Sequence, residues 1–416
     1  MEHQGPKITT SSPDTEPRPS VFRFVLATGA AESFGDVLVR TVLPILAVSV
    51  LGLGTDFVGL LNAVGLAAFL LLGMPIGMFI DRARNRVGVM GAATLARCLV
   101  ALFLTAGYHF GLLSGVVLLG AAILVGVADV VFTTAQSTVI PAVVPPRGLK
   151  AAFSRLALIN QATSTTAAGA GSAALALLGL PGLMLAAAAS YASSMLFQRG
   201  IGEGPVPAVQ RAKPSGQFSR GLATLRRTPA LWALTLSGSM INAGAMLGNT
   251  VLPVYILRDL GIPAAAYAAL GVISAAGAMA GAAAAPNLTK KLGLKSLRTG
   301  AALLSVPAVV MASVCPWLPG HELLWLSVQS LGWGFLVSIS AVAGAEVLPR
   351  TVAREDLATV GSAQRTITLG IMPVAAVLGG AAAAVVGTVP LLIVWALLAG
   401  AAALPLLRVD ALDGFR

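Results

Sequence analysis

The sequence predicts an all-α integral membrane protein with twelve transmembrane helices in two six-helix halves. Of its 416 residues, 56% are hydrophobic and only 10% are charged, and the mean hydropathy is +0.87. This composition is typical of a polytopic helical membrane protein. The chain also contains twelve mainly apolar runs that each approach the roughly twenty residues a spanning helix needs. The longest polar connection, 200–229, divides these runs six and six.

The expected spans follow one another through short polar connections. Their ranges are 22–49, 57–80, 87–108, 113–138, 152–178, 181–199, 230–256, 264–286, 298–318, 322–347, 357–385 and 388–407. The first six make an N-terminal half, 21–199, and the last six a C-terminal half, 230–407. Residues 1–20 are polar and rich in Ser, Thr and Pro, so they are expected to be a disordered cytoplasmic tail. Residues 408–416 are expected to form a second cytoplasmic tail.

The connection 200–229 has the composition of a solvated linker with room for a short surface helix. It contains Pro205, Pro207, Pro214 and Gly216 among several basic residues. Six-plus-six architectures that place a substrate site between the halves, near the bilayer midplane, are common among secondary transporters. The site is therefore expected between the two halves.

The basic residues predict that both termini are cytoplasmic, in a multi-pass protein of the cell membrane. Cytoplasmic loops carry the excess of Lys and Arg, and here the even-numbered connections carry it, with Arg258 beside Asp259 as the exception. These connections hold Arg82, Arg84, Arg86, Arg147, Lys150, Arg199 to Arg227, Lys290, Lys291, Lys295, Arg298, Arg350 and Arg354. The formal charge of +11 is thus mostly a topology signal. No nucleic-acid partner is expected, because no folded domain presents a basic patch.

Three charged residues in the first predicted span lie on one helical face. Glu32, Asp36 and Arg40 are spaced by four, which stacks them over roughly two turns. Each ionised group in a bilayer costs at least a few kcal/mol, unless it faces a protein-lined cavity with water. The stripe is therefore predicted to face such a cavity. The alternative is that these charges pair with other helices and only hold the bundle together.

Arg97 in span three and Asp129 in span four lie at depths similar to that stripe, so a charged cluster is expected. Burial disfavours an ionised carboxylate and a nearby arginine favours it, so proton binding could be linked to conformation or substrate. Asp36 is predicted to carry the proton, followed by Glu32 and Asp129. Arg40 or Arg97 is the expected counter-charge. For Asp129 and Arg97, a fixed ion pair between helices is an equal alternative.

Neutral polar side chains in the spans are the candidates for lining a substrate cavity. Each could instead form a hydrogen bond between packed helices, worth about half a kcal/mol. They are Asn160, Gln161, Thr165, Asn242, Asn249, Gln329, Trp333, Ser340 and Gln364. Cys98 and Cys315 lie inside spans and give neither a disulfide framework nor a metal cluster. No nucleotide-binding loop, metal-spaced histidines or nucleophile constellation is present, so neither a cofactor nor an enzymatic activity is expected.

The connection between spans two and three carries a recognisable motif. It contains Gly77, Asp81, Arg82 and Arg86, with Arg84 where a glycine and Asn85 where a basic residue is usual. This pattern resembles the signature of the major facilitator superfamily, Gly-x-x-x-Asp-Arg/Lys-x-Gly-Arg-Arg/Lys. The resemblance implies the major facilitator fold. It assigns this loop to gating between the halves and not to substrate contact.

Further stretches resemble the branch of drug and siderophore exporters that includes macrolide-efflux and enterobactin-exporter relatives. They run from Phe132 to Pro141, from Leu252 to Gly261 and from Gly361 to Gly380. This resemblance implies a monomeric, proton-coupled antiporter that exports a drug, siderophore or secondary metabolite by alternating access, a multidrug-resistance type of efflux.

Two departures from the exporter pattern concern coupling. Span four lacks the arginine that many antiporters place before a glycine like Gly126, and Ala168 to Gly171 replaces their Gly-Pro-x-x-Gly-Gly. If those elements are needed for antiport in relatives, this chain couples differently. Uptake or facilitated diffusion of a nutrient or lipid, and a transport-inactive receptor or assembly partner, are the alternatives.

Overall fold

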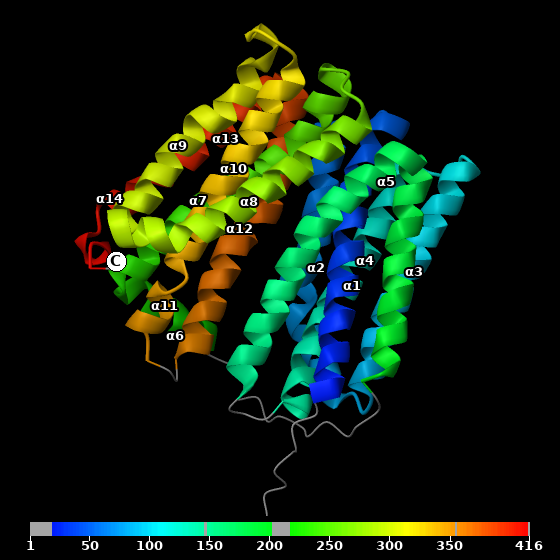
Figure 1. The fold of residues 1–416 in the computed structure, drawn as a ribbon, viewed down its shortest axis with the longest axis horizontal. Helices are drawn as coiled ribbons and strands as arrows, with labels where there is room; N and C mark the ends of the chain where they lie inside the picture. Colours follow the sequence, from blue (N-terminus) through cyan, green and yellow to red (C-terminus); the bar gives the residue numbers. More distant parts are fainter. Residues whose placement is uncertain (1–18, 145–147, 202–216, 354–355, 415–416) are drawn as a thin grey trace, which may run out of the picture.

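The computed structural model describes residues 19–144, 148–201, 217–353 and 356–414, and across these ranges the regular structure is helical. The helices form two bundles that lean against each other (Figure 1). In the described ranges, eleven stretches are long and apolar enough to cross a membrane. One of them, Ala162–Arg199, contains two crossings, so the twelve predicted spans are all present.

The N-terminal half starts with a long helix that ends in a π-helical turn. Its elements are α1 (Pro19–Ile45), η1 (Leu46–Val50), α2 (Thr55–Arg82), α3 (Arg86–His109), α4 (Gly115–Val143) and α5 (Leu149–Arg199). The helix α5 contains a break at Gly179, where φ is +68° and ψ is −168°. Glycine adopts this conformation without a Cβ clash, and Pro181 follows it. The chain reverses there, so α5 has two arms, 149–178 and 180–199, which supply the fifth and sixth predicted spans.

The C-terminal half repeats this pattern. Its elements are α7 (Pro229–Val254), η3 (Tyr255–Asp259), α8 (Ala264–Leu292), α9 (Leu294–Val314), η4 (Cys315–Trp317), α10 (Glu322–Gly344), α11 (Val347–Thr351), α12 (Leu357–Val386), α13 (Thr388–Ala401), α14 (Leu404–Leu407) and η5 (Asp410–Leu412). Between the halves, α6 (Gln217–Arg227) is the short helix for which the linker had room. It packs on α12, where a Cβ on Gly221 would lie 2.5 Å from the Thr359 carbonyl oxygen.

Two matching corners join the halves at one end. Pro44 and Pro253 each come two residues before a π-helical turn, η1 or η3, and each turn is followed by a glycine at positive φ, Gly52 (+64°) or Gly261 (+65°). The sequences at the two corners thus impose the same backbone path on pseudo-equivalent helices. The turns η1 and η3 contact each other across the interface between the halves.

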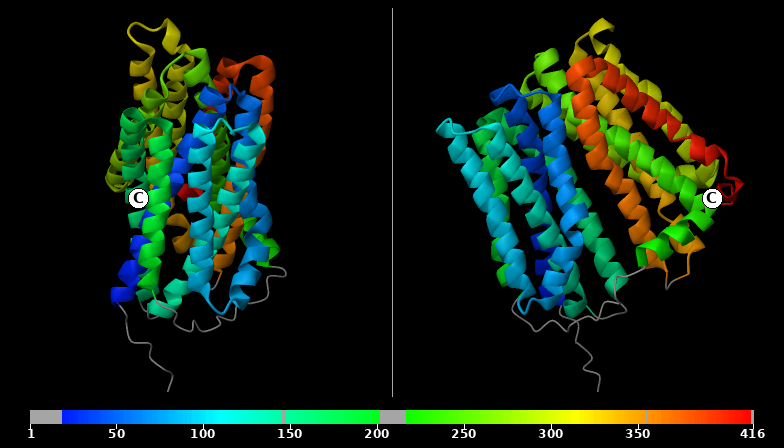
Figure 2. Two further views of the ribbon diagram at one scale, coloured as in Figure 1. Left: turned by 90° about the vertical axis from the view of Figure 1, so that its right-hand side faces the viewer. Right: turned by 180° about the vertical axis from the view of Figure 1, so that it is seen from behind.

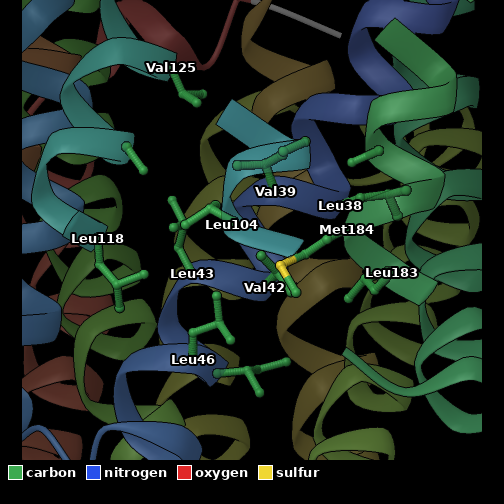
Figure 3. Packing of buried hydrophobic residues seen from close by; sticks show 14 of the residues in the cluster. Leu38, Val39, Val42, Leu43, Leu46, Leu104, Leu118, Val125, Leu183 and Met184 are labelled. Carbon is green, nitrogen blue, oxygen red and sulfur yellow. The ribbon is translucent and has the colours of Figure 1, made fainter. Parts of the chain in front are cut away.

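An apolar core fixes α1 within the N-terminal half. Leu38 and Val42 of α1 and Leu46 of η1 pack among side chains from α3, α4 and the second arm of α5 (Figure 3). These contacts also reach Val254 of the C-terminal half, since it belongs to the same buried cluster. The face of α1 that carries Leu38 and Val42 is thereby held inside the bundle.

The two halves contact each other closely at the end of the bundle that holds residues 51–54 and 260–263, here called the corner end. Thr55 Oγ1 donates to the Gly380 carbonyl oxygen at 3.1 Å, and a Cβ on Gly59 would lie only 2.3 Å from the Ala376 carbonyl oxygen. The other end, which holds residues 83–85, 200–201 and 228, is called the linker end. The bundles diverge toward it in both views that show them side by side (Figures 1 and 2).

Candidate functional site

A cavity of about 500 Å³ lies between the two halves. It touches α1, α2, α4 and the first arm of α5 on one side, and α7, α8, α10, α12 and α13 on the other. Its wall is mostly apolar, with Met246, Tyr267 and Met372 among the larger side chains. On the C-terminal side the rings of Trp333 and Trp395 meet edge to face at 4.8 Å. Such a wall suits a molecule with both apolar and polar parts.

Charged residues from three helices meet at Arg97, which is completely buried in the N-terminal half. Its Nη1 donates to Glu32 Oε2 at 2.7 Å and to Asp36 Oδ1 at 2.8 Å, and its Nη2 donates to Asp129 Oδ1 at 3.4 Å. The guanidinium also lies over the rings of Phe132 (5.5 Å) and Tyr191 (5.8 Å). A buried guanidinium with three carboxylate partners satisfies the rule that buried charges must be paired.

Glu32 lies at the sealed end of this cluster. Thr94 Oγ1 and Ser194 Oγ donate to its Oε1 at 2.5 and 2.7 Å, and Arg97 binds its other oxygen. Only 3% of the Glu32 side chain is exposed. Glu32 is not among the residues that line the central cavity.

Asp36 occupies an intermediate position. Its Oδ1 accepts from Arg97 and from the Tyr191 hydroxyl, each at 2.8 Å, and 18% of its side chain is exposed. The Tyr191 ring packs directly on Gly35, where a Cβ would lie only 2.7 Å from the ring, so this position requires glycine. The second arm of α5 thus brings a phenol to the middle of the charged stripe.

Asp129 and Arg40 form the end of the cluster that reaches the cavity. Arg40 Nη2 donates to Asp129 Oδ2 at 3.2 Å, and both residues belong to the cavity wall. The exposed fraction is 26% for the Asp129 side chain and 63% for that of Arg40. Asp129 therefore has the longest contacts and the greatest exposure of the three acids.

The structure brings all five predicted charged residues into this one cluster, but it separates the predicted cavity residues. Asn249, Gln329 and Trp333 line the cavity, whereas Asn160, Asn242, Ser340 and Gln364 are not among its lining residues. Asn242 instead donates to the Thr368 carbonyl oxygen at 2.8 Å, which joins α7 to α12. The side chains of Gln161, Thr165 and Asp81 lie outside the described part of the structure.

The expected orientation of Glu32 needs a correction. The sequence predicts that the stripe of Glu32, Asp36 and Arg40 faces a cavity with water, but in the structure Glu32 faces α3 and the second arm of α5. Asp36, bound by Arg97 and Tyr191, is also not among the residues that line the cavity. The physical reason is that hydroxyl groups and Arg97 on those helices satisfy the carboxylate inside the half. Only the Asp129 and Arg40 end of the cluster opens to the central cavity.

The predicted gating loop lies at the linker end. Arg82 is exposed, and a Cβ on Gly77 would meet no atom of the described residues within 4 Å. Arg86 is buried, and its Nε and Nη1 have no hydrogen-bond partner among the described residues. Asn85 caps α3 by accepting from Gly88 N at 2.6 Å.

Four polar residues of the cluster were not predicted from the sequence: Thr94, Tyr191, Ser194 and Gln198. Tyr191, Ser194 and Gln198 are spaced by three and four, so they share one face of the second arm of α5. That polar stripe is the signal that could have found them. Trp395 was missed because an apolar run surrounds it. Among the described residues, no group of His, Cys, Asp and Glu is arranged to hold a metal ion.

Two helical bundles with a cavity between them define a multi-pass membrane transporter. The family model described as Major Facilitator Superfamily matches residues 25–373, so the chain belongs to that superfamily. None of the curated proteins compared matches this sequence.

Solved structures share the fold at low identity. A bacterial homologue of the iron transporter ferroportin, inward-facing, has a TM-score of 0.73 and 15% identity, covering 95% of this chain and 100% of that one. A bacterial homologue of the human lysosomal transporter Spinster, inward-facing and unoccupied, has a TM-score of 0.68 and 17% identity, with 94% and 98% covered. The nucleoside transporter NupG has a TM-score of 0.69 and 13% identity, with 95% and 100% covered.

Proposed function

We propose that this protein is a proton-coupled exporter that moves an amphipathic small molecule through the central cavity by alternating access. It would act as a monomer in the cell membrane, with the linker end in the cytoplasm and with 21–199 and 230–407 as the two moving halves. The observation that carries the proposal is the charged cluster of Glu32, Asp36, Asp129, Arg97 and Arg40, because one end of it forms part of the cavity wall.

The charge balance of the cluster favours a mobile proton. Three carboxylates face two guanidinium groups, which leaves one negative charge in excess when all are ionised. An excess charge away from bulk water is relieved when one carboxylate binds a proton. The cluster as a whole then titrates, since its members interact strongly.

Asp129 is the member we assign to proton exchange with the cavity. Its two contacts, 3.2 and 3.4 Å, are longer than those of Asp36 or Glu32, and its side chain is the most exposed of the three. The sequence alone favours Asp36 as the proton carrier; Asp36 becomes the second candidate here because Arg97 and Tyr191 hold it at shorter distances. A substrate that contacts Asp129 or Arg40 would compete with the proton, which is what exchange requires.

The linker end would be the cytoplasmic end, and in this state it would be open for substrate to enter. Support comes from the contacts at the corner end, namely Thr55 with Gly380 and η1 with η3, and from the basic residues of the linker-end loops. The motif of Gly77, Asp81, Arg82 and Arg86 would close that end in the other state. Arg86, whose buried Nε and Nη1 have no partner among the described residues in this state, would gain one there.

The test measures proton release on substrate binding. Comparing the sensitivity of cells with and without the protein to drugs and metabolites identifies a substrate, which is then added to weakly buffered protein in detergent. Wild type is expected to release protons, and Asp129→Asn is expected to release fewer. Asp56→Asn, an exposed acid at the start of α2, is the matched control and should behave as wild type.

Two results would overturn the proposal. Equal proton release from wild type and from a variant with Glu32→Gln, Asp36→Asn and Asp129→Asn would refute proton coupling through the cluster. In inverted membrane vesicles, an exporter accumulates substrate only when the vesicle interior is acidified. Equilibration without accumulation, whatever the pH of the vesicle interior, would indicate facilitated diffusion, and proton-driven loss of preloaded substrate from the vesicles would indicate uptake.

A further inference from the structure

A second cavity, about 340 Å³, lies at the linker end between α3 and the second arm of α5. We call it the linker-end crevice; it is lined by Asn85, Val87, Gly88, Gly91, Met195, Gln198 and Arg199. None of these residues lines the central cavity. The crevice is thus a separate opening in the N-terminal half.

Gln198 connects this crevice to the charged cluster. Its Nε2 donates to Thr94 Oγ1 at 2.9 Å and to Ser194 Oγ at 3.2 Å. Its Oε1 is buried, since only 5% of Gln198 is exposed, and it has no hydrogen-bond partner among the described residues. A Cβ on Gly91 would lie 3.3 Å from that oxygen, so the oxygen faces the Gly91 wall of the crevice. A buried acceptor without a partner is where an ordered water or a change of side-chain conformation is expected.

A continuous series of hydrogen bonds runs from this point to the central cavity. Thr94 and Ser194 both donate to Glu32 Oε1, and Glu32 Oε2 binds Arg97. Arg97 in turn contacts Asp129, which belongs to the cavity wall. Glu32 therefore lies nearer to the crevice in this series, and Asp129 lies at the cavity.

We infer that Glu32 exchanges its proton with water at the linker end through the crevice, by a route that the substrate does not use. This inference rests on the proposed proton coupling. When the Gln198 amide turns toward the crevice, water takes its place beside the hydroxyls of Thr94 and Ser194. The proton then passes from Glu32 to a hydroxyl oxygen, and that hydroxyl gives its own proton to the water. A hydroxyl both donates and accepts, so the transfer balances, whereas Gln198 only positions the hydroxyls and admits the water.

The charged and titratable groups around Glu32 act on this transfer in opposite directions. The negative charge of Asp36 favours protonated Glu32, whereas the positive charge of Arg97 favours the ionised form. Arg199 at the crevice is positively charged and therefore opposes an incoming proton. Among the described residues, the groups that face Glu32 or its hydroxyl partners are Asp36 of α1, Thr94, Arg97 and Cys98 of α3, and Tyr191, Ser194 and Gln198 of α5. Asp129 of α4 lies on the far side of Arg97.

Two substitutions of Gln198 separate a proton route from a purely structural role. Gln198→Ala and Gln198→Leu both remove the hydrogen bonds to Thr94 and Ser194. Alanine leaves space that water fills, whereas leucine fills it with an apolar group. A structural role predicts the same effect for both variants, whereas a proton route predicts that only Gln198→Leu slows proton exchange at Glu32.

The measurement follows the exchange of hydrogen for deuterium on the protonated Glu32 carboxyl, by infrared difference spectroscopy on the full-length protein in nanodiscs. The Glu32→Gln variant assigns the carboxyl band. We expect Gln198→Leu to slow the exchange by about tenfold or more, and Gln198→Ala to leave it unchanged or faster. Asn249→Leu, a comparable change in the wall of the central cavity, is expected to have no effect.

Three outcomes would overturn the inference: equal slowing by both Gln198 variants, slowing by Asn249→Leu, or no protonated Glu32 between roughly pH 5 and pH 9. A second measurement tests for water in the crevice. In a background with Cys98→Ser and Cys315→Ser, Met195→Cys should react with a charged thiol reagent much faster than Leu196→Cys, whose side chain is exposed on the apolar surface. Equal rates would contradict a water-filled crevice. Proton release on substrate binding, reduced by Asp129→Asn, tests the proposed function separately.

Discussion

Among single substitutions in the charged cluster, Arg97→Gln should lower the free energy of unfolding most. Glutamine removes the positive charge that pairs with Glu32 and Asp36, while Asp129 keeps Arg40. Removing one partner of a buried ion pair typically costs about 3–5 kcal/mol, because the remaining charge stays buried and unpaired. Glu32 accounts for most of the expected loss, since only 3% of its side chain is exposed.

The loss should depend on pH with a definite sign. The penalty applies to ionised carboxylates, and protonation relieves it. In Arg97→Gln the folded state therefore favours the protonated acids more than the unfolded state does, and this variant is more stable at low pH than at high pH. The destabilisation relative to wild type should be largest at about pH 8 and should shrink toward about pH 5.

The assay is reversible unfolding by a denaturing detergent in mixed micelles, at both pH values. Arg40→Gln is the matched control, because Arg40 is 63% exposed and an exposed ion pair is worth about 1 kcal/mol or less. Adding Glu32→Gln to Arg97→Gln should recover much of the stability, since the unpaired carboxylate is gone. A loss below about 1 kcal/mol, or the same loss at both pH values, would refute this account of the cluster.

Two further substitutions test the closed end and the cluster. Gly59→Leu should open the corner end, because its Cβ would lie 2.3 Å from the Ala376 carbonyl oxygen. The distance between spin labels at Leu112 and Trp317 should then increase. Gly73→Leu, at a position where a Cβ meets no described atom within 4 Å, should leave that distance unchanged. Tyr191→Phe should destabilise the protein by about 1.5–3 kcal/mol through its lost bond to Asp36, and Tyr108→Phe should have a much smaller effect in the same unfolding assay. An unchanged distance between the spin labels in Gly59→Leu, or equal destabilisation by Tyr191→Phe and Tyr108→Phe, would contradict these predictions.

The sequence predicted the helical class and the path of the chain well because hydropathy along the chain decides which segments enter a bilayer. The expected spans 57–80 and 87–108 lie within α2 and α3, each one or two residues shorter than the helix at either end. The fifth and sixth spans were also placed correctly, since Gly179 and Pro181 supply the turn between them. The Pro44 and Pro253 corners could have been found as an internal repeat.

The candidate site was predicted only in part. The intramembrane charges Glu32, Arg97 and Asp129 stand out against an apolar background, so they could be singled out from the sequence. Their pairing could not, because it depends on which helices adjoin α1. Asn160 and Gln364 show the same limit, since a polar residue in a span does not reveal whether it faces the cavity or a neighbouring helix.

The sequence by itself determined how many times the chain crosses the membrane and which charges lie within the bilayer, because both follow from the local balance of apolar and charged residues. Only the tertiary structure decided that Glu32 turns away from the central cavity while Asp129 reaches it. The reason is that α3 and the second arm of α5, distant in sequence from α1, supply the guanidinium and hydroxyl groups that bury Glu32.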